Sequence, residues 1–167
     1  MARGHAGRRG SLTGAGVPRV RHARPADLPN VALLAAEHAA YEKAAPPAAD
    51  LPQRLETLLF GPAAPRLCCF IAELDDGEII GYASCAPELS TWDGAEYLHM
   101  DCLFLRDGHR GLGVGPMLMD AVLAEARARG LSQVQWQTPP WNKDAIRFYD
   151  RLDAQVKEKR RYFLSVD

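Results

Sequence analysis

A glycine-rich run in the second half of the chain is the segment best suited to chemistry. It consists of Arg110, Gly111, Leu112, Gly113, Val114 and Gly115. A β-like segment precedes the run, and Pro116 opens an amphipathic helical pattern directly after it. Glycine has no Cβ, so the backbone can bend tightly here and approach a ligand closely. The exposed amides and the positive end of the following helix dipole suit a phosphate or pyrophosphate, and Arg110 can add a charge-assisted contact.

Two other nucleotide-binding turns do not fit this run. A Walker A loop ends in Gly-Lys-Ser/Thr, whereas Gly115 is followed by Pro116 and Met117. A dinucleotide fingerprint needs a third glycine where Pro116 stands, and an acidic residue about 20 positions later that the segment 134–138 lacks. A plain turn at the start of a helix is the alternative that the run alone leaves open.

A second motif follows further along the chain. Trp141 and Asn142 precede a short pattern in which Ala145, Phe148 and Tyr149 recur at helical spacing. Taken together, the Arg-x-x-Gly-x-Gly turn and the Asn-x-x-Ala-x-x-Phe-Tyr pattern resemble the GNAT superfamily of acyl-CoA-dependent N-acetyltransferases. Both motifs match in order and in spacing.

This resemblance implies acetyl-CoA as co-substrate and predicts its contacts. Backbone atoms of the strand before the turn would pair with the pantetheine arm, and the turn would hold the pyrophosphate. Asn142 would hydrogen-bond the pantetheine or its phosphate side, a role compatible with capping the helix that follows. The expected contacts are Leu103, Phe104, Leu105, Arg110, Gly111, Leu112, Gly113, Val114, Gly115, Pro116 and Asn142.

Below the superfamily level, the chain is most similar to the diamine acetyltransferase branch, which contains spermidine/spermine and thialysine acetyltransferases. The matching segments are 40–42 (Ala-Tyr-Glu), 90–94 (Ser-Thr-Trp-Asp-Gly) and 141–142 (Trp-Asn). In that branch a Tyr-Glu pair and an acidic pair bind the cationic amine, which implies this role for Tyr41, Glu42 and Asp101. Trp92 is expected to form a wall of the same small site. Cys102 replaces the second acid of the pair, which argues against a long polyamine.

Transfer of an acyl group to an ammonium ion needs both a base and an acid. The nitrogen must lose a proton before it attacks the thioester, and the departing thiolate must receive one. Tyr149 is the expected acid, and the resemblance assigns it the same role; packing against Phe148 is the alternative. Asp101 and Glu42 are the candidates for the base, although Asp101 could instead anchor the cation. His99 ranks behind both, on the strand face that it shares with Asp101 by simple alternation.

Length and composition agree with this interpretation. The chain has 167 residues, which suits one domain with a sizeable core. No apolar run is long enough to span a membrane. The cysteines lie in apolar, strand-like segments without Cys-x-x-Cys spacing, which indicates reduced, buried thiols in a cytoplasmic protein and neither a metal site nor disulfides. They are Cys68, Cys69, Cys85 and Cys102.

Charge is distributed unevenly along the chain. Residues 1–26 contain six arginines and no acid. Positions 27–109 hold 14 acids and 4 bases, whereas positions 110–167 hold 7 acids and 10 bases. An acidic half and a basic half suit an amine on one side and a polyanionic co-substrate on the other; solvated charges without such a role are the alternative. We expect 1–18 to be a disordered basic extension and 19–167 to be the N-acetyltransferase (GNAT) domain.

The elements that must position these residues follow a readable order. Strands are expected at 20–23, 68–73, 78–85, 96–105, 134–138, 155–158 and 162–166, with helices after Asp27 and at 51–60, 116–129 and 145–152. His38 and Tyr41 fall on the apolar face of the first helix, residues 75–77 (Asp-Asp-Gly) predict a hairpin turn, and Gly130 predicts a helix end. This order is the GNAT layout: an α/β (α+β) fold with a central, mostly antiparallel mixed sheet of six to seven strands and about four helices.

The combined expectation is an N-acetyltransferase that moves an acetyl group from acetyl-CoA to a primary amine of a small cationic substrate by direct attack in a ternary complex. A diamine, a polyamine, a lysine-like amino acid and an amine-bearing antibiotic all fit the residues. A non-catalytic acyl-CoA sensor is the alternative from another class. The resemblance also implies a homodimer, and we expect no metal, membrane or nucleic-acid partner.

Overall fold

The computed structural model describes residues 17–63 and 66–166 of the chain. They fall into two compact units, one ending at Trp136 and the other beginning at Gln137. Most of the expected N-terminal extension, residues 1–16, lies outside the described residues. Within the described ranges, none of the helices combines the length and the apolar character needed to cross a membrane.

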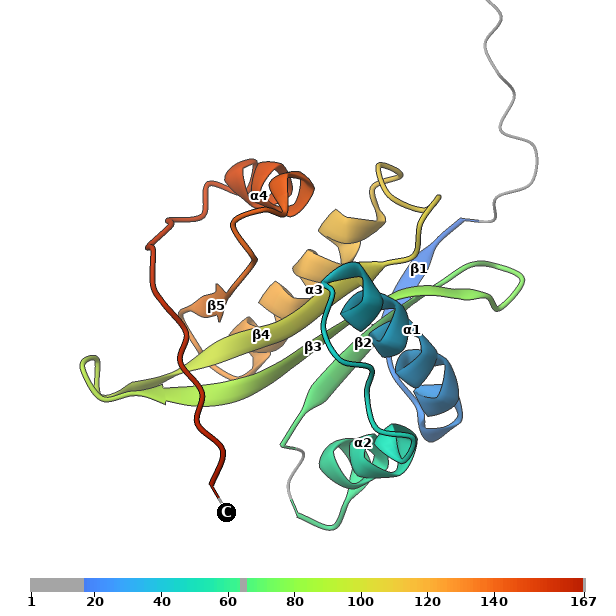
Figure 1. Cartoon of the computed structure of the whole chain (residues 1–167), viewed down its shortest axis with the longest axis horizontal. Helices are drawn as coiled ribbons and strands as arrows, with labels where there is room; N and C mark the ends of the chain where they lie inside the picture. Colours follow the sequence, from blue (N-terminus) through green and yellow to red (C-terminus); the bar gives the residue numbers. More distant parts are fainter. Residues whose placement is uncertain (1–16, 64–65, 167) are drawn as a thin grey trace, which may run out of the picture. The chain divides into compact units, whose positions relative to one another are not determined.

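A mixed sheet of five strands lies at the centre of the first unit (Figure 1). The strands are β1 (Arg19–His22), β2 (Cys68–Glu73), β3 (Ile79–Ser90), β4 (Ala95–Leu105) and β5 (Val134–Trp136). They lie side by side in sequence order; the first four are antiparallel to one another, and β5 runs parallel to β4. The α+β class and the mostly antiparallel order agree with the prediction, but the described residues form five strands and not six or seven.

Helices cover both faces of this sheet (Figure 1). On one face, α1 (Leu28–Tyr41) packs against α2 (Leu51–Phe60) and against β3 and β4, and Cys69 and Ile71 of β2 join its core. The alternate residues of β2, Phe70 and Ala72, are buried outside that core, on the face that α3 (Val114–Ala128) covers. Since both faces are covered, β2 is buried along its whole length.

Turn residues end these elements where the sequence predicts. In the β2–β3 hairpin, Gly77 has a φ of 89° and Asp76 Oδ1 accepts the N–H of Glu78 at 3.0 Å. Gly130 follows α3 with a φ of 70°. α3 begins at Val114, two residues before the expected Pro116, because Gly113 in the left-handed conformation already serves as its N-cap. Pro116 still lies in the first helical turn, where its missing N–H breaks no helical hydrogen bond.

The two strands expected at 155–158 and 162–166 are corrected by the structure. The second unit contains α4 (Lys143–Asp150), and no strand forms in its described residues after that helix. The apolar residues Val156, Tyr162 and Phe163 are exposed. An isolated two-stranded hairpin is marginal in water, and the basic residues gathered at 157–161 repel one another at its turn. Asp153, just after α4, has a φ of 54°, a left-handed conformation that Asp tolerates better than most residues.

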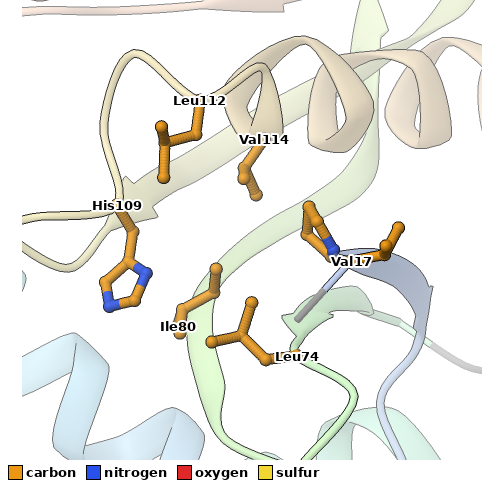
Figure 2. Close-up of a pocket in the computed structure, with 7 residues that line it drawn as sticks. Val17, Leu74, Ile80, His109, Leu112 and Val114 are labelled. Atoms are coloured by element: carbon orange, nitrogen blue, oxygen red, sulfur yellow. The ribbon is translucent and has the colours of Figure 1, made fainter. Parts of the chain in front are cut away.

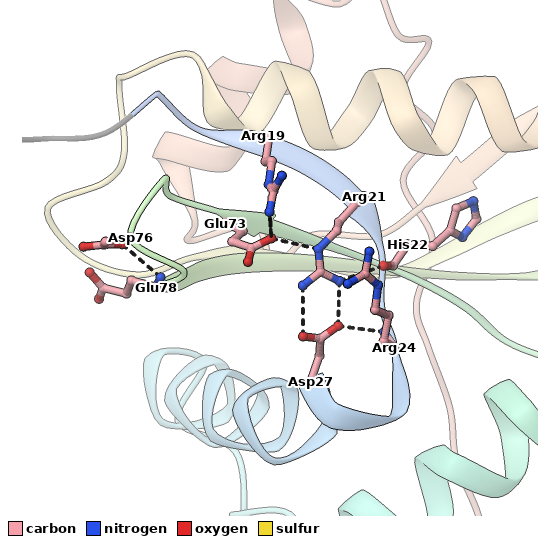
Figure 3. A network of polar contacts seen from close by, with 8 residues as sticks. All are labelled: Arg19, Arg21, His22, Arg24, Asp27, Glu73, Asp76 and Glu78. Carbon is pink, nitrogen blue, oxygen red and sulfur yellow. Dashed lines mark hydrogen bonds and ion pairs between the residues drawn. The ribbon is translucent and has the colours of Figure 1, made fainter.

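A largely buried ion network joins β1, β2 and the start of α1 (Figure 3). Arg21 donates two hydrogen bonds to the carboxylate of Asp27, at 2.7 and 3.0 Å, and one to Glu73 at 2.8 Å. Asp27 also accepts the backbone N–H of Arg24 at 2.7 Å. Its carboxylate therefore closes the short 3-10 turn before α1 and makes no capping hydrogen bond to α1 itself. Hydrogen bonds from Arg21 hold the pKa of both carboxyls below the usual range.

Replacing Arg21 with Met should lower the free energy of unfolding by about 3 kcal/mol at neutral pH, because the buried Asp27 carboxylate then loses its paired guanidinium and Glu73 keeps only the exposed Arg19. The side chains of Arg21, Asp27 and Glu73 are only 19%, 10% and 11% exposed. Urea unfolding measures the loss. Arg19→Met is the matched control: Arg19 also bonds Glu73, but its side chain is 67% exposed, so we expect a loss below about 1 kcal/mol. Equal losses in the two variants would contradict this account.

The stability of the wild type and that of Arg21→Met should depend differently on pH. Because folding lowers the pKa of Asp27 and Glu73, their contribution to stability is present above the ordinary carboxyl pKa of about 4 and is lost as the pH falls below it. The stability difference between the wild type and Arg21→Met should therefore shrink on acidification. Unfolding curves over a pH series test this, and a difference that stays constant would count against the network.

Candidate active site

The glycine-rich turn has the backbone geometry of an anion site. Gly111 and Gly113 have φ values of 77° and 83°, a left-handed region that suits glycine, and a Cβ built at either position would meet no heavy atom within 4 Å. Gly113 has no side chain to cap α3, and the first amides of a helix have no acceptor within it. The turn therefore presents open backbone at the N-terminus of a helix, where anions bind favourably.

An apolar hollow of about 250 Å³ lies beneath this turn (Figure 2). Leu112 and Val114 of the turn point toward it, as do Leu74 and Ile80 from the β2–β3 hairpin. His109 is the one titratable side chain among its lining residues. Without an acid, the hollow is not suited to bind an amine; it gives the turn an apolar support.

Arg110 connects the turn to the end of α1. Its guanidinium carbon lies 4.7 Å from the centre of the Tyr41 ring and 5.9 Å from that of Phe104. Its Nε donates a hydrogen bond to the carbonyl of Leu105 at 3.3 Å, and Asp107 pairs with its other end at 3.4 Å. The expected phosphate contact of Arg110 therefore competes with a cation–π contact to Tyr41. Tyr41 itself lies beside the glycine turn.

Strand β4 separates from its neighbour β5 partway along its length. β4 pairs with β3 from Ala95 to Leu105, but it pairs with β5 only from Leu98 to Met100. Past Met100, no strand among the described residues pairs with that edge of β4. Leu103, Phe104 and Leu105, the expected pantetheine contacts, lie on this open stretch. An extended ligand can add itself to such an edge through backbone hydrogen bonds.

A β-bulge at Asp101 marks the separation. Met100 pairs with Cys85 and Cys102 pairs with Ser84, so Asp101 has no opposite residue on β3. Asp101 is exposed, whereas Met100 is buried and Cys102 packs against the core beneath α1. Bulges redirect side chains and recur next to active sites. The simple alternation that predicted a shared face for His99 and Asp101 is interrupted at this point.

Glu42 directly follows α1 and pairs with His38 one helical turn earlier. His38 Nε2 lies 3.4 Å from Glu42 Oε1, and His38 Nδ1 lies 3.4 Å from the hydroxyl of Tyr82. The imidazole also stacks on Phe104, with ring centres 5.0 Å apart. The sequence pattern assigned His38 only to an apolar helix face, but its i,i+4 spacing from Glu42 was a signal of this pair.

Cys102 extends this set of contacts to Asp101. Its thiol donates to Asp101 Oδ2 at 3.5 Å, and Cys102 packs against the same core as Tyr82. Burial raises the pKa of Cys102 to about 11, and burial raises the pKa of Tyr82 well above its usual range. Both groups are therefore neutral at physiological pH. Glu42 therefore contacts His38, which bonds Tyr82, and Asp101 contacts Cys102; Tyr82 and Cys102 belong to one core cluster.

The structure does not bring Trp92 to these acids. Trp92 lies in the turn between β3 and β4, and it is 97% exposed. Asp101 lies about 20 Å farther along β4, given roughly 3.3 Å per residue. Within the first unit, Trp92 therefore lies away from Asp101. His99, the lower-ranked base, is partly buried and pairs with Ala86 and Gln135 in the sheet.

The second unit carries the remaining expected residues, Asn142 and Tyr149. Asn142 Oδ1 accepts the N–H of Ala145 at 3.2 Å, so it caps α4 as the sequence predicts. Tyr149 is partly buried on α4, with its ring centre 5.1 Å from that of Phe148. These contacts orient both residues within the second unit.

Known proteins resemble this chain in sequence and in fold. The profile of the acetyltransferase (GNAT) family matches residues 32–154. Thialysine N-epsilon-acetyltransferase from Caenorhabditis elegans is 31% identical over 70% of this chain and 70% of its own length. L-ornithine N5-acetyltransferase NATA1 from Arabidopsis thaliana is 29% identical, but the match covers 53% of this chain and only 39% of that protein. The crystal structure of the aminoglycoside acetyltransferase meta-AAC0020, from an uncultured soil sample, shares the fold with a TM-score of 0.72 at 17% identity, over 89% of this chain and 95% of that one.

Replacing Gly113 with Asp should abolish acetyl-CoA binding, because the change adds bulk, backbone strain and negative charge to the anion-binding turn. Isothermal titration calorimetry measures the affinity. Gly77→Asp is the matched control, since Gly77 has a similar φ of 89° and equally open surroundings in the β2–β3 hairpin. We expect that control to bind like the wild type. Micromolar binding by Gly113→Asp would show that the pyrophosphate lies elsewhere.

Proposed function

Because this chain belongs to the acetyltransferase (GNAT) family, we propose that it transfers the acetyl group of acetyl-CoA to the side-chain amine of a small, lysine-like amino acid or diamine. One observation carries the proposal: the open glycine turn, the β4 edge without a strand partner and the acids Glu42 and Asp101 all belong to the first unit. The names of the relatives from Caenorhabditis elegans and Arabidopsis thaliana both specify a side-chain nitrogen of an amino acid.

In this proposal acetyl-CoA binds along the open stretch of β4. The backbone of residues 103–105 pairs with the pantetheine arm, and the turn from Arg110 to Gly115 receives the pyrophosphate with the N-terminus of α3. Pro116 stiffens the first helical turn behind it. Asn142 hydrogen-bonds the pantetheine side while it caps α4. The open β4 edge and the uncapped helix support this arrangement.

The amine binds at the acids, in this proposal, with Tyr41 beside them. Glu42 and Asp101 supply two carboxylates for the ammonium group. The residue next to Asp101 is the neutral thiol of Cys102, whose pKa is raised to about 11, so the strand offers one negative charge where an acidic pair would offer two. A single charged amine needs no more than this. The residues therefore favour a short substrate over a long polyamine.

The reaction forms a bond between the amine nitrogen and the acetyl carbon and breaks the bond from that carbon to sulfur. A carboxylate, Glu42 or Asp101, removes one proton from the ammonium ion, and the freed electron pair attacks the thioester carbonyl. Collapse of the tetrahedral adduct expels the thiolate, which takes its proton from Tyr149. The second proton lost by the nitrogen restores Tyr149 through solvent. Holding both substrates together supplies much of the acceleration, since effective molarities reach about 10⁵ M or more.

A thiol-release assay with acetyl-CoA tests the proposal directly. The panel is thialysine, ornithine, lysine, putrescine, spermidine and an aminoglycoside. We expect the highest kcat/KM for one of the amino acids or for putrescine, and a lower value for spermidine. Tight binding of acetyl-CoA without turnover of any amine would favour the acyl-CoA sensor instead.

Removal of the Tyr149 hydroxyl should lower kcat. We expect Tyr149→Phe to reduce kcat roughly 10- to 1,000-fold and to leave the Kd for acetyl-CoA unchanged, because the phenol acts on the departing thiolate only in the transition state. Steady-state kinetics and calorimetry measure the two effects. Tyr162→Phe, at an exposed position of the same unit, serves as the control and should retain full activity. An unaltered kcat in Tyr149→Phe would end the assignment.

A further inference from the structure

Three side chains that commonly bind metals meet away from the candidate active site. They are His22 at the end of β1, Cys68 at the start of β2 and Glu125 in the last turn of α3. One ligand atom from each lies within 4.8 Å of the others. The Cys68 sulfur is 3.6 Å from His22 Nδ1, and His22 Nε2 is 3.9 Å from Glu125 Oε2. The second distance exceeds that of a hydrogen bond, so the imidazole and the carboxylate lie near each other without one.

The types and the spacing of these ligand atoms fit a zinc ion. Zinc binds thiolate, imidazole and carboxylate groups at about 2.0–2.3 Å, which places tetrahedral ligands roughly 3.3–3.8 Å apart. The two contacts of 3.6 and 3.9 Å are close to that spacing. An ion uses one ring nitrogen, and the side chain of His22 is 66% exposed, so its ring can turn to present that nitrogen. Magnesium and calcium prefer oxygen ligands, so this mixed set does not suit them.

The carboxylate of Glu125 is already oriented for such a role. Arg129, one helical turn later, donates a hydrogen bond from Nε to Oε1 of Glu125 at 2.6 Å, and Oε2 is the oxygen that faces His22. Carboxylates that bind metals are commonly held by a hydrogen bond of this kind. The His22 ring packs against Phe70, with ring centres 4.5 Å apart, and points away from the Arg21 network (Figure 3).

A hollow of about 330 Å³ lies beside the cluster, lined by residues of β1, β2 and α3. His22 and Glu125 both line it, and the other α3 residues of its lining are the small Ala121, Ala124 and Ala128. The hollow therefore offers an ion an entry path and leaves room for a water molecule as a further ligand.

We propose that His22, Cys68 and Glu125 form a zinc site, with water as the fourth ligand. Binding displaces the thiol proton of Cys68 to solvent, since a coordinated thiol is deprotonated. The ion then joins β1, β2 and the last turn of α3. The sequence predicted no metal because it lacks Cys-x-x-Cys spacing, but His22 and Cys68 are 46 residues apart and only the fold brings them together. This site does not depend on the proposed acetyl transfer.

Cobalt(II) spectroscopy of the untagged, full-length protein tests the ligand set. A thiolate bound to Co²⁺ gives an intense charge-transfer band in the near ultraviolet, and we expect the wild type to show this band and to lose it when Zn²⁺ is added. Cys68→Ala should remove the band. Cys85→Ala is the matched control and should keep it, because Cys85 is also buried and lies opposite Cys68 on β3, but outside the cluster.

Three spectroscopic results would overturn the inference. They are a wild type without the band, a band that survives in Cys68→Ala, and a band that Cys85→Ala removes. Because these spectra require no amine and no acetyl-CoA, they are separate from a failure of the proposed function.

Thermal unfolding tests the same site through the exposed ligand. Zn²⁺ should raise the wild-type Tm by several degrees, because it binds residues of three elements that unfolding separates. Mg²⁺ at the same concentration should not. His22→Gln should lose most of the zinc-induced rise, whereas His109→Gln, outside the cluster, should keep it. An equal rise in His22→Gln and in the wild type, or no rise in the wild type, would contradict the zinc site.

Discussion

Strand β4 has a neighbour on each side, β3 and β5, and the candidate site lies where its pairing with β5 ends. It stays hydrogen-bonded to β3 from end to end, yet β5 accompanies it only from Leu98 to Met100. The bulge at Asp101 sits where the second pairing stops. Beyond it the backbone of β4 is open on one side, and the chain turns directly into the glycines that precede α3. A fully paired β4 would have neither this open edge nor a redirected Asp101.

The same bulge explains why polar groups accumulate inside an apolar layer. It moves Cys102 into the core beneath α1, where Tyr82 and His38 also lie, and buried polar groups are costly unless each one finds a partner. Tyr82 bonds His38, His38 contacts Glu42, and Cys102 donates to Asp101. A cysteine fits this position better than a second acid, because its thiol is neutral in the core and still donates a hydrogen bond to Asp101. The same contacts therefore provide partners for the polar groups in the core and hold Glu42 and Asp101 in place.

Arg21 fixes the other end of α1, its N-terminus, to the sheet. Its bonds to Asp27 and Glu73 join β1, β2 and the first turn before the helix, so the start of α1 is fixed to the sheet. The far end of α1 is held by the stacked rings of His38 and Phe104 and by Arg110 over Tyr41. Glu42 therefore projects from a helix that is fastened at both ends. Such support matters because a misplacement of about 1 Å can cost 100-fold in rate.

The sequence by itself determined the family, the element order up to α4, the glycine turn before α3 and the capping role of Asn142, because these depend on local patterns: glycines with positive φ, alternating or helical spacing, and capping residues. It wrongly predicted two strands after α4. In the described structure, the apolar and basic residues there have no neighbouring strand to pair with. Only the tertiary structure decided the rest. Register set the bulge at Asp101, and packing of α1 on β3 and β4 brought His38 to Tyr82 and Arg110 to Tyr41. Those contacts join residues far apart in the chain, and no local pattern encodes a strand register or the partner of a buried side chain.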